Sequence, residues 1–485
     1  MEWTRKKRYL PYKDWSAETL LDLQAAAANS TQQMRYHLRP ISGLVNDPNG
    51  FSFFDGEYHV FYQSYPFGAV HGLKSWVHFK SPDLVHWENL GLAVKPDSMA
   101  DSHGAYSGSA MQIGDELFLM YTGNHRDKNW DRTPYQIGAW MNKYGKVHDK
   151  EILFKNPDHI SEHFRDPQII KYDDTYYAIL GAQDKATKRG NIDIWKSNNL
   201  KNWEELGFLK FTDHDLGYMV ECPNLVYVDG KVVLIFCPQG LDKKIANYQN
   251  IYPNMYVIAD GIDWENCRLI NPSEMHNLDD GFDVYATQAF TAPDKHSYAI
   301  SWVGLPDIGY PTDQENWANC LSQVKELHIN NGKLIQKPVQ AMESLRQNLI
   351  NQPEQINDYI KSNQYELNLK IKAGQTGSFS MAASKDLNDG LKISFDTGDG
   401  KLVLDRSKCA NPAAEKYGQI REIELDKNKD LELDIFVDHS LVEIFVNNGE
   451  AVLTGRFFTN QNNRFIKFDN KCDYTAKLWN LDTIL

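Results

Sequence analysis

Three acidic residues stand beside prolines at separate places along the chain, and their side chains could do chemistry together. Asp47 and Asp166 each directly precede a proline, and Glu221 precedes a Cys-Pro pair. Glycoside hydrolysis uses two carboxyl groups, one protonated and one ionised, and a third could accept hydrogen bonds from sugar hydroxyls. Asp-Pro is also a common turn pair, so each acid alone could belong to an ordinary turn. Three acids in one register favour a catalytic site.

That register comes from a pattern that recurs five times. Each copy has a short strand, an Asp-containing turn and a second strand rich in Tyr and Phe. The copies span 47–63, 107–123, 166–182, 221–238 and 287–304. Their turn aspartates, 55 to 65 residues apart, are Asp55, Asp115, Asp174, Asp229 and Asp294. Asp in such a turn, most clearly in the Asp-Gly pairs, predicts a β-hairpin.

A tryptophan follows three of these hairpins, at Trp87, Trp203 and Trp264. A repeat of this length, with room for four short strands, is typical of a β-propeller blade. We therefore predict an all-β fold with a five-bladed β-propeller, in which the copies of the acidic position converge at one end of a central funnel. A run of unrelated hairpins in a large sandwich is the alternative.

The segments on either side of the repeats differ from them. Residues 16–33 predict a helix with Ser16 as its N-cap, within an N-terminal helical extension over 1–35. The propeller is expected over 36–337 and a linker or short helix over 338–352. Alternating strands over 353–485 carry no acidic start motif and predict a second all-β domain, a β-sandwich.

Composition excludes several classes of protein. Lys and Arg total 51 against 65 Asp and Glu, a net charge of −14, which disfavours nucleic acid and anionic membranes as partners. No apolar run is long enough to predict a membrane span. The basic N-terminus is not followed by the apolar stretch of a signal peptide, and six scattered cysteines read as free thiols, so a cytoplasmic location is expected.

The acidic motifs resemble those of a known enzyme family. Asn46-Asp47-Pro48-Asn49-Gly50, Arg165-Asp166-Pro167 and Glu221-Cys222-Pro223 are similar to the signatures of the family-32 glycoside hydrolases, the invertase and sucrose-6-phosphate hydrolase group. Residues 438–445 (DHSLVEIF) look like the family's C-terminal signature, so the resemblance runs from about Tyr36 to the end. The chain departs from the usual pattern at Leu44-Val45, Gln168 and Asn224, none of which is a motif carboxylate. The family fold is a five-bladed propeller followed by a sandwich.

The resemblance implies a role for each acid. Asp47 would attack the anomeric carbon of a fructofuranosyl unit, and Glu221 would protonate the leaving oxygen and then activate water. Asp166 would hold the fructose hydroxyls. The implied activity is a retaining β-fructofuranosidase acting on sucrose 6-phosphate, sucrose or both. Alternatives are a fructosidase of short fructo-oligosaccharides or a non-catalytic sugar-binding propeller.

Other residues near the motifs are candidates for substrate binding. Amides can donate to and accept from sugar hydroxyls, and aromatic faces can cover a sugar ring. The candidates are Asn46, Gln63, Trp76, Tyr106, Ser107, Arg165 and Trp302. Arg126 and Lys128 are the nearest candidates for a substrate phosphate. No cofactor is expected, and no metal either, since His71, His78 and His103 lack ligand spacing. The oligomeric state stays open.

Overall fold

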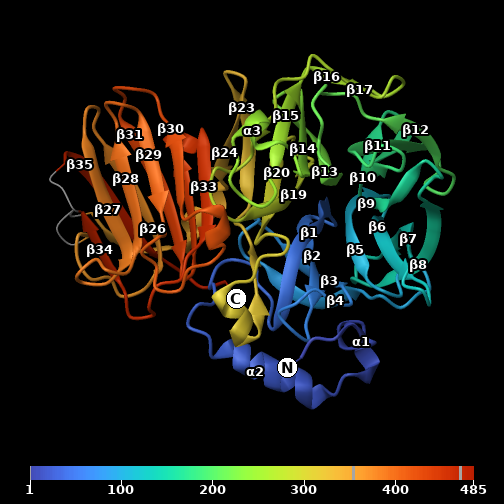
Figure 1. Ribbon diagram of the computed structural model, residues 1–485, viewed down its shortest axis with the longest axis horizontal. Helices are drawn as coiled ribbons and strands as arrows, with labels where there is room; N and C mark the ends of the chain where they lie inside the picture. Colours follow the sequence, from blue (N-terminus) through green and yellow to red (C-terminus); the bar gives the residue numbers. More distant parts are fainter. Residues whose placement is uncertain (1, 352–355, 469–471, 485) are drawn as a thin grey trace.

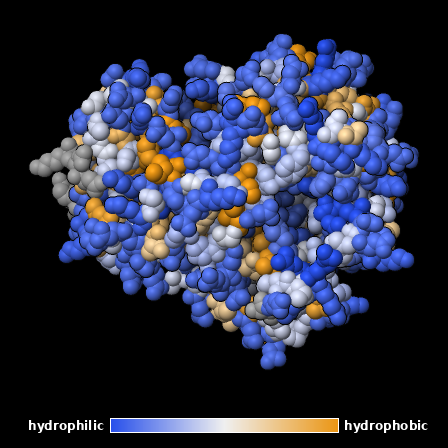
Figure 2. Space-filling model, viewed as in Figure 1, coloured by the Kyte–Doolittle hydropathy of each residue, from blue (hydrophilic) through white to orange (hydrophobic). Residues whose placement is uncertain are grey.

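The computed structural model describes residues 2–351, 356–468 and 472–484, and strands dominate it. The all-β class expected from the sequence is confirmed. Strands of the repeats and strands of the C-terminal part form two neighbouring bodies, with the N-terminal helices beneath the first (Figure 1). The face in Figure 2 is mainly hydrophilic, with hydrophobic residues scattered in small groups.

The N-terminal segment contains three short helices: α1 Arg5–Arg8, the 3₁₀ helix η1 Tyr12–Asp14 and α2 Ala17–Ala28. The Ser16 hydroxyl accepts a hydrogen bond from the Thr19 amide at 3.1 Å, so the predicted N-cap is confirmed. The helix ends at Ala28, before the predicted Gln33. The Tyr12 hydroxyl donates to the Leu73 carbonyl at 2.9 Å and Trp15 stacks on Phe67, which fastens this segment to the first sheet.

Five antiparallel sheets follow in chain order within the described residues. The first two have the orders β21-β1-β2-β3-β4, in which β21 joins β1 in parallel, and β5-β6-β7-β8. Their strands are β1 Gly43–Phe54, β2 Glu57–Tyr65, β3 Ser75–Ser81, β4 Glu88–Val94, β5 Ala105–Ile113, β6 Glu116–Arg126, β7 Arg132–Met141, β8 Val147–Lys155 and β21 Trp317–Ala318.

The third, fourth and fifth sheets have the same plan, with the orders β9-β10-β11-β12, β13-β14-β15-β18 and β19-β20-β23-β24. Their strands are β9 Ile160–Tyr172, β10 Thr175–Asp184, β11 Gly190–Ser197, β12 Glu204–Phe208, β13 Met219–Val228, β14 Lys231–Gln239, β15 Met255–Ala259, β18 His276–Asn277, β19 Val284–Thr291, β20 Ser297–Val303, β23 Lys325–Asn330 and β24 Lys333–Pro338. Smaller elements are β16 Gly261–Asp263, β17 Arg268–Ile270, β22 Cys320–Leu321, the helix α3 Lys243–Ala246 and the 3₁₀ helix η2 Pro311–Glu315.

The first strands of these five sheets contact one another in sequence: β1 with β5, β5 with β9, β9 with β13, β13 with β19, and β19 with β1. All five turn aspartates lie between the two strands of a hairpin, as predicted. Trp87 and Trp264 are buried, and Trp203 packs on a neighbouring cluster, so these tryptophans serve the cores of their sheets.

Two further sheets, β25-β35-β26-β31-β32-β33 and β30-β29-β28-β27-β34, enclose one hydrophobic core. Their strands are β25 Arg346–Ile350, β26 Gln364–Ile371, β27 Thr376–Ala383, β28 Leu391–Asp396, β29 Lys401–Asp405, β30 Ile420–Glu424, β31 Leu431–Asp438, β32 Leu441–Val446, β33 Ala451–Arg456, β34 Phe465–Phe468 and β35 Tyr474–Leu481. The 3₁₀ helices η3 Gln340–Leu345, η4 Glu415–Tyr417 and η5 Asn447–Gly449 complete this part. The expected linker, 338–352, thus contains η3 and a paired strand.

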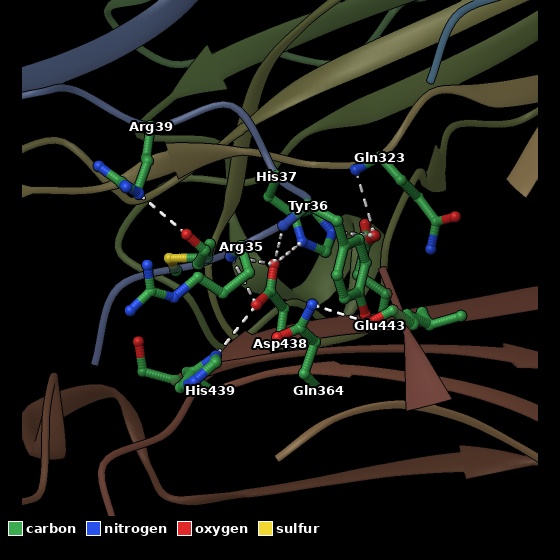
Figure 3. A network of polar contacts seen from close by, with 12 residues as sticks. Arg35, Tyr36, His37, Arg39, Gln323, Gln364, Asp438, His439 and Glu443 are labelled. Atoms are coloured by element: carbon green, nitrogen blue, oxygen red, sulfur yellow. Dashed lines mark hydrogen bonds and ion pairs between the residues drawn. The ribbon is translucent and has the colours of Figure 1, made fainter. Parts of the chain in front are cut away.

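The C-terminal signature ties this part to the chain that enters β1 (Figure 3). The Asp438 carboxylate accepts hydrogen bonds from the amides of Arg35 and Tyr36 and contacts His37 Nδ1 at 2.9 Å. His37 Nε2 lies 3.1 Å from Glu443 Oε2 on the neighbouring strand. Because residues 35–37 lead directly into the strand that carries Asp47, this network fixes where that strand begins.

Asp283, the acid that precedes the fifth repeat, also holds the two bodies together. It accepts hydrogen bonds from Arg406 Nη1 at 2.7 Å, from the Arg456 amide at 2.8 Å and from the Tyr310 hydroxyl at 2.8 Å. The side chain is completely buried and fully engaged in this contact.

Candidate active site

A β-bulge interrupts the first strand of each of the five sheets at the same place. In each hairpin two residues of the first strand oppose one residue of the second. The bulged pairs are 46–47, 106–107, 166–167, 222–223 and 286–287. A bulge bends the strand and re-aims its side chains. The candidate acids lie in these bulges or directly before one.

The bulges also hold unusual backbone conformations. Asp166, Cys222 and Ala286 have φ angles of 66°, 47° and 49°. Non-glycine residues rarely adopt this left-handed region, and such conformations cluster at functional sites. The repeated distortion therefore positions the acids, which the hairpin pattern alone does not reveal.

Asp47 lies at the centre of a chain of side-chain hydrogen bonds. The Ser107 hydroxyl donates to Asp47 Oδ2, and Asn46 Nδ2 lies 3.1 Å from Asp47 Oδ1. Gln63 Nε2 donates to the Ser107 oxygen at 2.5 Å, and Gln63 Oε1 accepts from Asn46 Nδ2 at 2.7 Å. Burial raises the pKa of Asp47, and the bonds from Ser107 and Asn46 oppose that rise. These donors stabilise the ionised carboxylate.

Lys74 is a second buried charge behind Asp47. Its ammonium donates to Asn46 Oδ1. Burial lowers the pKa of Lys74 to about 7, and the nearby Asp47 carboxylate opposes this shift. Asn46 therefore connects the lysine to the carboxylate through one amide.

Asp166 is held by backbone groups. The Cys222 amide donates to Asp166 Oδ2 at 3.1 Å, and the Asp166 amide donates to the Thr122 hydroxyl at 3.0 Å. Burial raises the pKa of Asp166 to about 7; Arg165 opposes this rise, while Glu221 and Asp47 add to it. Cys222 Sγ lies 3.6 Å from Asp166 Oδ2 and 3.7 Å from Asp47 Oδ2, so the two carboxylates flank one thiol.

Glu221 accepts from four donor groups. Arg165 binds Oε1 through Nε at 2.9 Å and Nη2 at 2.8 Å. Oε2 accepts from Gln239 Nε2 at 2.6 Å and from the Tyr285 hydroxyl at 2.7 Å. A hydroxyl can also accept, so the Tyr285 hydroxyl can turn and receive a proton carried by Oε2. The site thus offers two buried aspartates and one glutamate that is able to exchange a proton.

The expected aromatic platforms have different surroundings. Tyr106 is half-buried, and its hydroxyl accepts from Asn124 Nδ2 at 3.1 Å. Trp76 is completely buried, and its indole donates to the Tyr106 carbonyl at 3.0 Å, so its ring supports Tyr106 from behind. Trp302 is 2% exposed and packs edge-on against Tyr285. A sugar contact by either tryptophan stays a prediction.

Several residues of the site were missed by sequence reasoning: Lys74, Thr122, Gln239 and Tyr285. Tyr285 occupies the position directly before the bulge, as Arg165 and Glu221 do in their strands. Because the bulge is known only once both strands are paired, the repeat pattern alone contains no signal for Tyr285. The other three residues lie outside the first strands, where the repeat contains no signal either.

Among the residues that the structure describes, no group of three or more His, Cys, Asp or Glu side chains is arranged to hold a metal ion. No helix among these residues combines the length and apolar character needed to span a membrane.

Comparison with known proteins places the chain in a family. Residues 37–338 match the N-terminal domain of glycosyl hydrolases family 32, and residues 333–482 match the C-terminal domain of the same family. The chain therefore belongs to glycosyl hydrolase family 32, and it is a glycoside hydrolase.

Similar proteins cover nearly the whole chain. A sucrose-6-phosphate hydrolase from Streptococcus mutans is 47% identical over 93% of this chain and 94% of its own length. The solved structure of a sucrose-6-phosphate hydrolase from Lactobacillus gasseri is 55% identical, with a TM-score of 0.97 and full coverage of both chains. A mutant Bombyx mori β-fructofuranosidase in complex with sucrose is 28% identical, with a TM-score of 0.82 over 96% of this chain and 97% of its own.

Proposed function

We propose that this chain is a retaining β-fructofuranosidase that hydrolyses sucrose 6-phosphate, and also sucrose, to fructose and glucose 6-phosphate or glucose. The observation that carries the proposal is the meeting of three motif carboxylates at repeated bulges, in a chain that is 44% and 47% identical to two proteins named sucrose-6-phosphate hydrolase. A small sugar is the partner that such a site binds.

In the first half of the reaction, a carboxylate oxygen of Asp47 attacks the anomeric carbon of the fructosyl unit. The bond from that carbon to the leaving oxygen breaks, its electron pair stays on the oxygen, and Glu221 supplies the proton. The product is a covalent fructosyl ester of Asp47 and free glucose 6-phosphate. The hydrogen bonds from Ser107 and Asn46 support this assignment, because they favour ionised Asp47.

In the second half, Glu221 removes a proton from water, and the water oxygen attacks the anomeric carbon. The ester bond breaks, the electron pair returns to Asp47, and fructose leaves. Asp166 accepts hydrogen bonds from fructose hydroxyls, and so do Asn46 and Gln63 through their amide oxygens. Charge that develops on the sugar ring in each transition state is stabilised by the neighbouring carboxylates.

The proposed architecture is a five-bladed propeller over 36–337, a linker over 338–352 and a β-sandwich over 353–485, after the helical extension of residues 1–35. The contacts between the first strands of successive sheets, and the single core between the last two sheets, support it. We also propose a cytoplasmic location, which the six free cysteines support.

The proposal is tested by fructose release from sucrose, sucrose 6-phosphate and 1-kestose. The Asp47→Ala and Glu221→Ala variants, shown to be folded by circular dichroism, should lose at least about 1,000-fold in kcat on sucrose 6-phosphate. Wild-type rates in either variant would overturn the assignment. Preference of the wild-type protein for 1-kestose over both sucrose substrates would instead identify a fructosidase of short oligosaccharides.

A further inference from the structure

A pair of arginines faces each other next to the candidate active site. Arg126 ends β6 and Arg132 begins β7, and the two are direct cross-strand partners in the hairpin. Like charges in this position repel each other and destabilise a sheet. Across the described residues, neither guanidinium forms an ion pair with a carboxylate. Asp127 and Asp131 lie in the same loop, but they do not pair with either arginine, so the two guanidinium groups face each other without a direct counter-ion.

Each arginine also has a guanidinium nitrogen that lacks a hydrogen-bond partner among the described residues. Arg126 Nη1 donates to the Trp130 carbonyl at 2.8 Å, but its Nε is buried with no partner among the described residues. Arg132 Nε is likewise buried and unpartnered in that part of the chain, and the guanidinium lies 5.9 Å from the centre of the Tyr106 ring. Burial lowers the pKa of Arg132, and Arg165 and Arg126 lower it further. An anion that contacts the terminal nitrogens of these guanidinium groups would relieve the repulsion between the two charges.

Two neighbouring residues, Tyr106 and Arg165, link the arginine pair to the acids of the site. Tyr106, beneath Arg132, directly precedes Ser107, which donates to Asp47. Arg165, whose charge acts on Arg132, holds Glu221. The arginines are therefore close to the residues that hold both Asp47 and Glu221.

Two residues of the N-terminal segment, Arg5 and Tyr9, pack beside the arginine hairpin against Trp130. The Tyr9 ring packs edge-on against Trp130 at 5.2 Å, and the Arg5 guanidinium lies 4.5 Å from the centre of the Trp130 ring. Burial raises the pKa of Tyr9 to about 12, and Tyr106 adds to the rise through its charge and a side-chain hydrogen bond, so the Tyr9 hydroxyl is protonated at neutral pH. Tyr9, which follows α1, thus brings a hydroxyl to the hairpin, and Arg5 of α1 brings a further cation.

We propose that Arg126 and Arg132, with the Tyr9 hydroxyl, form a subsite for the phosphate group of a phosphorylated leaving sugar. The planar guanidinium fork suits phosphate oxygens, and charge-assisted hydrogen bonds are the strong ones. This inference rests on the proposed function, because it assigns the part of sucrose 6-phosphate that distinguishes it from sucrose. Lys128 is exposed and outside the subsite, although the sequence pointed to it together with Arg126.

The test is the ratio of kcat/KM on sucrose 6-phosphate to kcat/KM on sucrose. Arg126→Gln and Arg132→Gln should each lower this ratio by about 30-fold or more, because each removes charge-assisted bonds to phosphate. Tyr9→Phe, which deletes one neutral donor, should lower it about fivefold. Lys128→Gln is the matched control in the same loop and should leave the ratio unchanged.

Product inhibition gives a second measurement of phosphate binding, which does not depend on comparing rates between two substrates. Glucose 6-phosphate should inhibit sucrose hydrolysis by the wild-type protein at least about 30-fold more strongly than glucose, and Arg126→Gln should erase this difference. A wild-type protein that hydrolyses neither substrate would overturn the proposed function. A protein that prefers sucrose 6-phosphate, with a ratio that Arg126→Gln and Arg132→Gln leave intact, would overturn the subsite alone. Equal wild-type rates on both substrates would also refute the subsite.

Discussion

Arg165 binds a single oxygen of Glu221 through two nitrogens: Nε lies 2.9 Å and Nη2 2.8 Å from Oε1. Negative charge is therefore drawn to Oε1, while Oε2 is bound by Gln239 and by a hydroxyl that can reverse its bond. The arrangement distinguishes the two oxygens of one carboxyl group. In the proposed mechanism, Oε2 is therefore the oxygen that carries the proton.

Replacing Arg165 should therefore impair proton transfer more than sugar binding. In Arg165→Lys a single ammonium cannot reproduce the two-nitrogen contact, and we expect kcat on sucrose to fall about 100-fold. The loss should be much smaller on an aryl fructofuranoside, whose leaving group needs little protonation. Arg189→Lys, which alters an exposed ion pair with Asp215, is the control. Equal losses on both substrates would contradict the proposed role.

The Ser107 hydroxyl should set the lower pH limit of activity. Its hydrogen bond lowers the pKa of Asp47, so Ser107→Ala should raise that pKa. Because Asp47, the proposed nucleophile, has to be ionised, the acidic limb of the kcat/KM profile should move to higher pH. A lost bond to a charged group is worth about 1.5–3 kcal/mol, which corresponds to roughly a tenfold loss or more below the shifted limb.

Ser109→Ala is the matched control for this experiment, since the Ser109 hydroxyl lies on the same strand and donates to the Pro167 carbonyl rather than to a carboxylate. Its acidic limb should coincide with that of the wild-type protein. An unshifted limb in Ser107→Ala would show that the hydroxyl does not tune Asp47.

Cys222 should be dispensable as a nucleophile despite its position between two carboxylates. Burial raises the pKa of its thiol, and Asp166 and Asp47 raise it further, so the reactive thiolate is disfavoured. Cys222→Ala retains the hydrogen bond from the backbone amide to Asp166 and removes only the long contacts of the thiol with Asp166 and Asp47. We expect kcat to stay within about fivefold of the wild-type value, because a thiol is only a weak donor. Complete loss of turnover in a folded variant would place the thiol in the reaction.

Much of the molecule follows from local rules of sequence. An aspartate in a turn between alternating apolar runs predicts a hairpin, and the even spacing of these turns predicts a series of similar sheets. The register of the repeats predicts one shared position for Asp47, Asp166 and Glu221, but the structure offsets them: Asp47 is the second residue of its bulge, Asp166 is the first, and Glu221 directly precedes one. Ser16 before an alanine-rich run predicts the beginning of α2.

What the sequence does not reveal depends on cross-strand register and on contacts between distant segments. The bulges arise because two residues oppose one, and this count is known only once both strands are paired. Lys74 is important because Asn46 lies against it, and Arg132 because Arg126 faces it. The sequence suggests Trp76 as a sugar platform, and only the packing of the fold shows that its side chain is buried.

The link between the two bodies predicts a dependence of stability on pH. Burial by itself lowers the pKa of His37, but the hydrogen bonds with Asp438 and Glu443 outweigh it and raise this pKa to about 9, from an ordinary value of 6.5. A pKa that is higher in the folded state stabilises the protein fully below pH 6.5, and this contribution is lost as the pH rises through 9. The free energy of unfolding should therefore fall by roughly 3 kcal/mol over this interval. Urea denaturation at a series of pH values measures it.

The His37→Gln variant should be less stable at pH 6 and lack this part of the decline, whereas His148→Gln, at a solvent-exposed ion pair, should follow the wild-type curve. Parallel curves for His37→Gln and the wild-type protein would refute a charged His37 in the folded state.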